Sequence, residues 1–463
     1  MNFKVSYLLS QAIPLSIFGL QQVVVAEIPQ PATTVAQTNI QSATADTIVV
    51  QESNQFNISG GQSSDGSAPN LVHQLENFDL NSGDVANFIV NPDVANVINL
   101  IDSVQPSSIN GLLKLTSSDP NVASSANLFL VNSAGIIFGE DVSLNLPANL
   151  TATTSSGLLF QDRYLLSTDG TISEIALPGS VFSDSLSGPL ESPTVNNLTG
   201  DPTGYLLLTD SASPVSLELS PTLPVGSIEN RGNLQVSPQG SITLIGQYIQ
   251  NDGTIAAPNG TVNLVATSGD NLLRISQPGN LLSLELVPVD TLAATDLAQL
   301  LTGGSDESAT QIEIGSDGSQ TLIGASSLTP AAGTVLIRGS IDVSDGMSPD
   351  QGNVRSQANI LGNQINLVGG NIQANSVDTA GIISIGGMPM VDRLNAAYVV
   401  IDRDSQLSAT SSAAQGGDIR VWADDTVQFY GEATVTGASS DLDGTISIDA
   451  GNVVDIRQPA ARR

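Results

Sequence analysis

The sequence has no cysteine, a single histidine and few aromatic residues: one tryptophan, six tyrosines and ten phenylalanines in 463 positions. Without cysteine there is no disulfide, no thiolate nucleophile and no thiolate metal ligand. The lone His73 excludes mechanisms that need two imidazoles. Lys4 and Lys114 are the only lysines, so phosphate cradles and Schiff bases have almost no candidate residue. These absences argue against ordinary metabolic enzymology.

Positive charge is also scarce, since 13 Lys and Arg stand against 45 Asp and Glu, a formal net charge of −32. Nucleic-acid binding depends on basic side chains that displace counterions from phosphates, so no nucleic-acid partner is expected. The chain is nevertheless 40% hydrophobic, too apolar for a disordered acidic polymer. We therefore expect folded domains or one elongated repeat array.

Residues 1–26 are typical of a signal peptide. Lys4 precedes a mostly apolar run from Val5 to Val25, and small residues occupy the positions that signal peptidase reads before its cut. We predict cleavage between Ala26 and Glu27, passage through the periplasm and a secreted or cell-surface product. A membrane anchor is the alternative, but polar residues and a proline interrupt the run, and no later segment reaches roughly 18 continuous apolar residues.

Residues 228–267 nearly repeat themselves. Ile-Glu-Asn-Arg-Gly at 228–232 returns at 249–253 as Ile-Gln-Asn-Asp-Gly, and Pro-Gln-Gly-Ser-Ile-Thr-Leu-Ile at 238–245 returns at 258–265 as Pro-Asn-Gly-Thr-Val-Asn-Leu-Val. Short β-branched segments between Asn-Gly, Asp-Gly and Pro-x-Gly corners are typical of stacked β-coils. One coil cannot bury its inward Ile, Leu and Val alone, so coils stack about 4.8 Å apart around a shared apolar column. The prediction is a parallel β-helix, continued by similar segments at 333–337, 363–368, 381–385, 417–421 and 444–448.

At about 25 residues per coil, the mature chain would form roughly 15 to 18 coils. Two segments interrupt the repeat of about 20 residues. Residues 161–226 are rich in Pro, Ser and Gly and predict a long excursion with a few short strands. Residues Thr291 to Leu301 have the pattern of a short amphipathic helix that would cover a face or an edge of the solenoid.

Several blocks between Asp46 and Phe160 resemble the secretion domain of two-partner-secretion exoproteins, the N-terminal module of filamentous haemagglutinin-like adhesins. The blocks occur in the family's order and are Asn-Leu-Val-His-Gln-Leu-Glu-Asn-Phe at 70–78, Phe-Ile-Val-Asn-Pro-Asp-Val at 88–94, Pro-Ser-Ser-Ile-Asn-Gly-Leu at 106–112 and Ala-Asn-Leu-Phe-Leu-Val-Asn-Ser-Ala-Gly-Ile-Ile-Phe-Gly at 126–139. Segments within 282–304 and 416–431 resemble the β-helical stem of the same exoproteins.

The resemblance implies an all-β, right-handed parallel β-helix with an N-terminal cap and loop or short-helix excursions. It implies a non-enzymatic, adhesin-like exoprotein of a Gram-negative cell, exported by an outer-membrane two-partner-secretion transporter with periplasmic domains. A cell-surface or glycan receptor would be its target. The expected divisions are a signal peptide at 1–26, the secretion domain at 27–160, the excursion at 161–227 and the stem at 228–463.

Two motifs of the family are altered here, and both are expected to take part in transporter recognition. The family's Asn-Pro-Asn-Leu is Asn91, Pro92, Asp93 and Val94, a mild change because Asp also forms Asx-turns and Val also fills an inward slot. Its Asn-Pro-Asn-Gly is Asn132, Ser133, Ala134 and Gly135. Because proline presets the turn dihedral, Ser133 should make this second turn less rigid.

A β-helical carbohydrate-active enzyme is the alternative from another functional class, and a truncated exoprotein fragment is a third reading. Glycoside hydrolysis needs two carboxylates at a fixed separation, which Asp402 with Asp404, Asp424 with Asp425, or Asp441 with Asp443 could supply. The Gly-His-Gly and Arg-Ile-Lys elements of pectin-cleaving β-helices are absent, however, and no catalytic residue is predicted.

No cofactor or metal site is predicted either. The sequence contains no EF-hand loop, and residues 60–65 lack the third glycine of the calcium-binding nonapeptide. We expect His73 to be a packed residue of the capping region, and Trp422 and Phe429 to belong to the packing of the stem.

Overall fold

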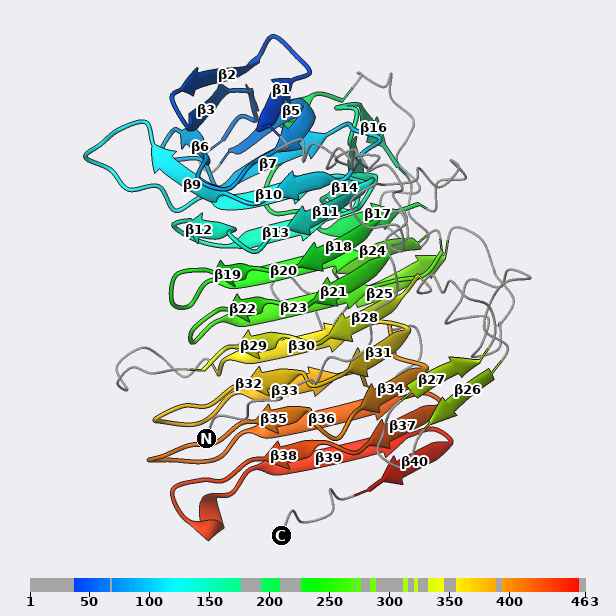
Figure 1. The fold of residues 1–463 in the computed structure, drawn as a ribbon. Helices are drawn as coiled ribbons and strands as arrows, with labels where there is room; N and C mark the ends of the chain where they lie inside the picture. Colours follow the sequence, from blue (N-terminus) through cyan, green and yellow to red (C-terminus); the bar gives the residue numbers. More distant parts are fainter. Residues whose placement is uncertain are drawn as a thin grey trace, which may run out of the picture. The chain divides into compact units, whose positions relative to one another are not determined.

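The computed structural model describes residues 37–66, 69–175, 193–208, 226–269, 271–275, 284–288, 311–314, 320–323, 332–344, 355–388 and 394–457. The predicted signal peptide and the predicted helix at Thr291–Leu301 lie outside these residues. The described chain is almost entirely β-structure, and it winds repeatedly through three sheet faces as a parallel β-helix (Figure 1). Within this part of the chain, no helix is long and apolar enough to cross a membrane.

Face 1 is a 12-stranded sheet that runs the length of the helix. Ten of its strands are parallel, and the short β1 and β4 pair antiparallel with β5 at the N-terminal end. Its strands are β1 (Asn39–Ser42), β4 (Gln62–Ser63), β5 (Asn70–Asp79), β7 (Asn96–Ile101), β10 (Asn127–Val131), β13 (Leu150–Thr153), β20 (Ser241–Gly246), β23 (Thr261–Ala266), β30 (Gln357–Leu361), β33 (Ile382–Ile385), β36 (Asp418–Ala423) and β39 (Thr445–Ala450).

Face 2 is a nine-stranded parallel sheet that follows face 1 in every coil after the first. Its strands are β8 (Ser107–Ile109), β11 (Gly135–Phe138), β18 (Ser227–Asn230), β21 (Tyr248–Asn251), β28 (Thr334–Ile337), β31 (Gln364–Leu367), β34 (Tyr398–Ile401), β37 (Thr426–Phe429) and β40 (Val453–Ile456).

Face 3 consists of two sheets and leads each coil back to face 1. The first has five strands, β2 (Thr47–Glu52), β3 (Gln55–Gly60), β6 (Val85–Val90), β9 (Leu112–Ser117) and β12 (Ser143–Asn145). The second has six, β19 (Asn233–Gln235), β22 (Thr254–Ala256), β29 (Ser340–Asp342), β32 (Asn371–Gln373), β35 (Gln406–Ser408) and β38 (Glu432–Thr434). The antiparallel hairpin of β2 and β3, together with β1 and β4, forms the cap at the N-terminal end.

The repeat read from the sequence is the stacking register of the structure. Ile228 pairs with Ile249 on face 2, a shift of 21, and Ile242 pairs with Val262 on face 1, a shift of 20. The inward side chains of all three faces are buried in one continuous apolar column, because alternate residues of each strand point to the same side. The predicted parallel β-helix is therefore confirmed.

The Asn-x-Gly corners between face 2 and face 3 are explained by close stacking. Asn230 Nδ2 donates a hydrogen bond of 2.7 Å to Asn251 Oδ1 in the next coil. Two residues further on, a Cβ atom on Gly253 would lie 2.1 Å from the carbonyl oxygen of Gly232. Only glycine allows the two backbones to approach this closely.

An antiparallel sheet lies outside the coils and covers the outward side of face 1. We call it the outer sheet; its strands are β14 (Gly157–Phe160), β15 (Tyr164–Ser167), β16 (Ile172–Glu174), β17 (Gly204–Leu207), β24 (Asn271–Ile275) and β25 (Leu284–Pro288). On β7, Val97 packs in the inner column, whereas Ile98 packs in a second apolar cluster with Phe160 and Tyr205 of the outer sheet. This part of face 1 is thus buried on both sides.

The outer sheet explains why the coils are fewer than their predicted number. Ten parallel strands of face 1 lie in the described residues, against the 15 to 18 coils that length suggested. The described strands within 157–207 and 271–323 join the outer sheet or the separate hairpin of β26 (Gln311–Ile314) and β27 (Gln320–Ile323), and add no coil. Two short 3₁₀ turns, η1 (Val195–Asn197) and η3 (Ser440–Leu442), complete the described elements.

Candidate functional site: two turns at the corners of the coils

The Asn91–Val94 turn connects β6 of face 3 to β7 of face 1. The Val94 amide donates to the Asn91 carbonyl at 3.1 Å, which closes the turn around Pro92 and Asp93. Asn91 and Asp93 are exposed, whereas Val94 is only 3% exposed and belongs to the inner apolar column. The turn is therefore anchored by its fourth residue and presents its polar residues outward.

A second turn of similar chemistry lies next to it. Asp119, Pro120, Asn121 and Val122 follow β9, which stacks directly on β6, and the Val122 amide donates to the Asp119 carbonyl at 3.2 Å. Val122 is 47% exposed, however, so this turn has no inward anchor. The turn was not predicted, although one pattern is common to 91–94 and 119–122: an acidic or amide residue, Pro, a second acidic or amide residue, and Val.

The two turns are linked by one side-chain contact. Ser118 Oγ donates a hydrogen bond of 3.1 Å to Asn91 Oδ1, and the Ser118 amide donates to the Val90 carbonyl at 2.7 Å. The corner of one coil is thus bonded to the corner of the next, with the Asn91 side chain still facing solvent.

The Asn132–Gly135 turn connects face 1 to face 2 and has the opposite environment. Asn132 is fully buried. Its Nδ2 donates to Gln105 O at 3.2 Å and to Ser107 Oγ at 3.0 Å, and its Oδ1 accepts from the Ala134 amide at 3.0 Å. The last bond is an Asx-turn, so the asparagine side chain organises a turn that lacks the family's proline.

Gly135 completes this corner, where any side chain would be strained. Its φ is +137°, in a region that side chains disfavour, and a Cβ atom would lie 3.0 Å from the Ser227 carbonyl oxygen of the next coil. The Gly135 amide donates to the Asn132 carbonyl at 3.1 Å. The two predicted motifs are therefore separate corners of the β-helix and do not form one joint site.

The acidic pairs considered as candidate catalytic residues contain carboxylates that accept hydrogen bonds within turns. Asp402 Oδ1 accepts hydrogen bonds from Ser405 Oγ at 2.6 Å and the Gly369 amide at 2.9 Å, and Asp443 Oδ1 accepts from the Gly437 amide at 2.9 Å. Trp422 Nε1 donates to Asp424 Oδ1 at 2.9 Å, which ties the single tryptophan to a corner. In the described residues, no three His, Asp or Glu side chains gather closely enough to hold a metal ion.

His73 lies in the interior of the first coil, on β5. It is fully buried, its ring centroid lies 6.4 Å from that of Phe88, and neither ring nitrogen has a hydrogen-bond partner among the described residues. Desolvation by burial lowers the pKa of His73 to about 4, so the imidazole is neutral at pH 7. This environment is that of a packed core residue.

Comparisons with known proteins identify a family for the chain. No curated protein matches the sequence. Among solved structures, the HMW1 secretion domain from Haemophilus influenzae is similar over 91% of this chain and 98% of that chain, with 14% sequence identity and a TM-score of 0.41. The family described as the TPS secretion domain, the export module of two-partner secretion, matches residues 32–306. Because this match covers more than half of the sequence, the chain belongs to the TPS secretion domain family.

Proposed function

We propose that this protein is a non-enzymatic, adhesin-like exoprotein whose Asn91–Val94 turn is read by its transporter. Membership of the TPS secretion domain family itself implies a secreted exoprotein and a cognate transporter in the outer membrane. The choice of this turn, the binding role after export and association with the cell surface are our proposals.

The observation that carries the proposal is the difference in exposure between the two turns. Asn91 and Asp93 face solvent, so a partner can contact them without disturbing the fold. Asn132 is fully buried and its amide is already bonded within the coil stack. We assign recognition to the first turn, and to the second the structural task of leading face 1 into face 2 once the chain folds.

The test is secretion in cells that make the cognate transporter. Asn91→Ala with Pro92→Ala should strand the protein in the periplasm, because it removes the outward amide and the preset turn. The matched control is Asp119→Ala with Pro120→Ala in the neighbouring turn, which should be secreted like the wild type. Normal secretion of the first variant, or an equal block in both, would refute recognition at this turn.

The non-enzymatic role is supported by the use of the acidic side chains. Asp402, Asp424 and Asp443 accept hydrogen bonds that hold corners together, so these carboxylates serve the fold. Cell fractionation with and without the transporter tests localisation: we expect the mature protein on the cell surface only when the transporter is present. Depolymerisation of an acidic polysaccharide, lost on changing one Asp pair to Asn, would contradict this role.

A further inference from the structure

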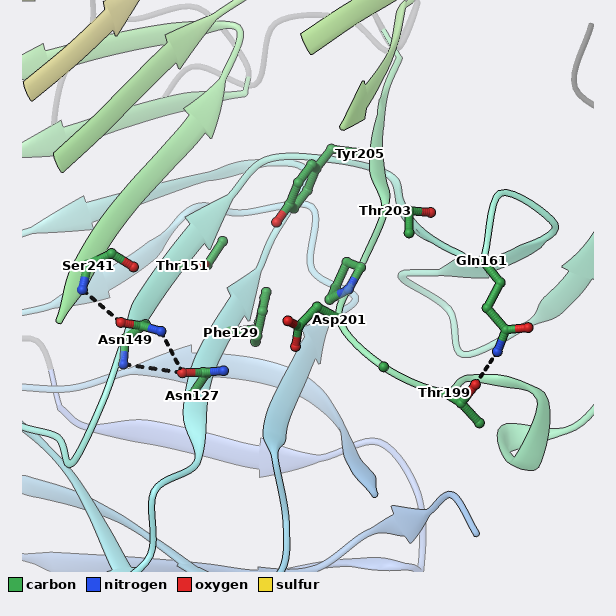
Figure 2. A pocket seen from close by; sticks show the side chains of 12 residues that line it. Asn127, Phe129, Asn149, Thr151, Gln161, Thr199, Asp201, Thr203, Tyr205 and Ser241 are labelled. Atoms are coloured by element: carbon green, nitrogen blue, oxygen red, sulfur yellow. Dashed lines mark hydrogen bonds between the residues drawn. The ribbon is translucent and has the colours of Figure 1, made fainter. Parts of the chain in front are cut away.

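A groove lies between face 1 and the chain that precedes and forms β17 (Figure 2). Its volume is about 410 Å³, within the size range of small-ligand sites. Asn127, Phe129 and Thr151 line it from the outward side of face 1, and Asp201 and Tyr205 line it from the opposite wall. None of its lining residues belongs to the turn to which we assign transporter recognition.

Two hydroxyl groups in this groove lack partners, although the residues that carry them are largely buried. Tyr205 is 5% exposed and Thr151 is 8% exposed, yet neither hydroxyl makes a hydrogen bond within the described residues. Neither oxygen is one of the enclosed, unpaired side-chain atoms of the described residues, so both hydroxyls reach the open groove and are available to a ligand or to water. Burial, with a smaller contribution from the Asp201 charge, raises the pKa of Tyr205, so its hydroxyl stays a neutral donor.

The asparagines of the groove are fixed by a ladder of stacked amides. Asn127 Nδ2 donates to Asn96 Oδ1 at 2.8 Å, and Asn149 Nδ2 donates to Asn127 Oδ1 at 2.8 Å. Asn96 Nδ2 also donates to Asp201 Oδ1 at 3.0 Å, which joins the ladder to the opposite wall. Each amide nitrogen of Asn127 and Asn149 has a second N–H group that these bonds do not use. The groove therefore presents donors and acceptors in a preorganised geometry.

The composition of the groove selects a class of ligand. Among the described residues that line it there is no Lys, Arg or His, the only charged side chain is Asp201, and the whole chain carries a net charge of −32. Phosphates, uronates and sialic acids would therefore be repelled. Phe129, Tyr205 and Pro202 add apolar surface beside the amides, the carboxylate and the hydroxyls. A ring with several neutral hydroxyls and one C–H face is complementary to this groove, because the hydroxyls can bond to the polar groups and the C–H face can contact the apolar surface.

We propose that this groove binds a neutral hexopyranose unit of a glycan. The Asp201 carboxylate and the Thr151 and Tyr205 hydroxyls form hydrogen bonds with sugar hydroxyls, and the C–H face of the ring lies against the apolar part of the groove wall. This site concerns what the folded protein binds, and it stands independently of how the protein is exported.

The experiment is titration of the purified mature chain with methyl glycosides of glucose, galactose, mannose and N-acetylglucosamine, followed by saturation-transfer NMR and calorimetry. We expect saturable binding of at least one glycoside with a dissociation constant on the order of 1 mM or tighter. N-acetylneuraminic acid, the anionic probe, should bind more weakly. No saturable binding of any neutral glycoside, or tighter binding of the anionic probe, would overturn the proposal.

Two conservative variants locate the site. Tyr205→Phe keeps the ring but removes the hydroxyl, and Asp201→Asn keeps Oδ1 as an acceptor for Asn96 but removes the charge. Each should weaken binding about tenfold, the effect of one good hydrogen bond. Tyr164→Phe, on β15 of the same outer sheet but outside the groove, is the matched control and should bind like the wild type. Asp201 is exposed, so its variant should fold normally, and undiminished binding in both groove variants would place the sugar elsewhere.

Discussion

Asn132 Nδ2 donates a hydrogen bond of 3.0 Å to Ser107 Oγ, so a fully buried amide on one coil is bonded to the face 2 strand of the preceding coil. Its Oδ1 also closes the Asx-turn through the Ala134 amide. Asn132→Ala would leave the buried Ser107 hydroxyl and the part-buried Ala134 amide without this partner. We expect a loss of about 2 to 3 kcal/mol in the free energy of unfolding, measured by urea denaturation of the purified protein.

Asn91→Ala is the control for that measurement, because Asn91 is exposed at the other turn. Exposed substitutions of this kind change stability by no more than about 0.5 kcal/mol. These two variants therefore separate an effect on folding from an effect on recognition. The Asn132→Ala protein should be destabilised, whereas the Asn91→Ala protein should be as stable as the wild type. Equal stability of the two variants would contradict the structural role of the buried asparagine.

Gly253 carries a second prediction about the corners. A Cβ atom there would lie 2.1 Å from the Gly232 carbonyl oxygen, so Gly253→Ala must push two coils apart. We expect a cost of about 2 kcal/mol or more, as for overpacked cores. Gly83→Ala is the comparison, since Gly83 has open space around it and only its φ of +82° opposes a side chain, at about 1 kcal/mol. Denaturation midpoints in the reverse order would show that this stacking does not limit the corner.

The parts of the fold that were predictable from the sequence are those in which one coil repeats another. Ile228 and Ile249 can be matched by eye because similar neighbours at the same spacing meet the same packing constraint in every coil. Asparagine and glycine recur at the corners for the reason seen in the structure: the amides stack and the backbones nearly touch. Packing constraints that repeat in every coil therefore produce a sequence that repeats.

The outer sheet could not be predicted in this way, because it occurs once. Ile98 and Phe129 look like ordinary strand residues, and only the packing of the outer sheet shows why their outward positions are apolar. The exposure of the candidate turns could not be predicted from the sequence either. Val94 and Val122 end turns of similar sequence, yet one is buried in the core and the other is exposed. The two connections also differ in length, since β6 and β7 are joined by five residues and β9 and β10 by nine.

His73 should make stability depend on pH in a definite direction. Its pKa is about 4 in the folded chain against 6.5 for the free side chain, so between these values the unfolded state binds more protons. The contribution of His73 to the free energy of unfolding is therefore fully present above pH 6.5 and is lost as the pH falls toward 4. Between pH 7 and pH 5 the loss should be about 2 kcal/mol.

The measurement compares wild type with His73→Leu at both pH values, because the many carboxylates contribute equally to each protein and cancel in the difference. Since His73 is the only histidine, its imidazole signal in the proton NMR spectrum also reports the folded pKa directly. An imidazole that titrates near pH 6.5 in the folded protein would show that the ring is hydrated.

The signal peptide gives the last prediction. Small residues at the first and third positions before the cut fit the signal peptidase pockets, so the exported protein should begin at Glu27. Mass spectrometry of the N-terminal peptide measures this. Ala26→Asp should block processing and hold the uncleaved precursor at the inner membrane, because a charged side chain does not fit the pocket. Ala32→Asp, beyond the cut, is the matched control and should be cleaved normally. A mature N-terminus at another residue, or normal processing of Ala26→Asp, would refute the assigned cleavage site.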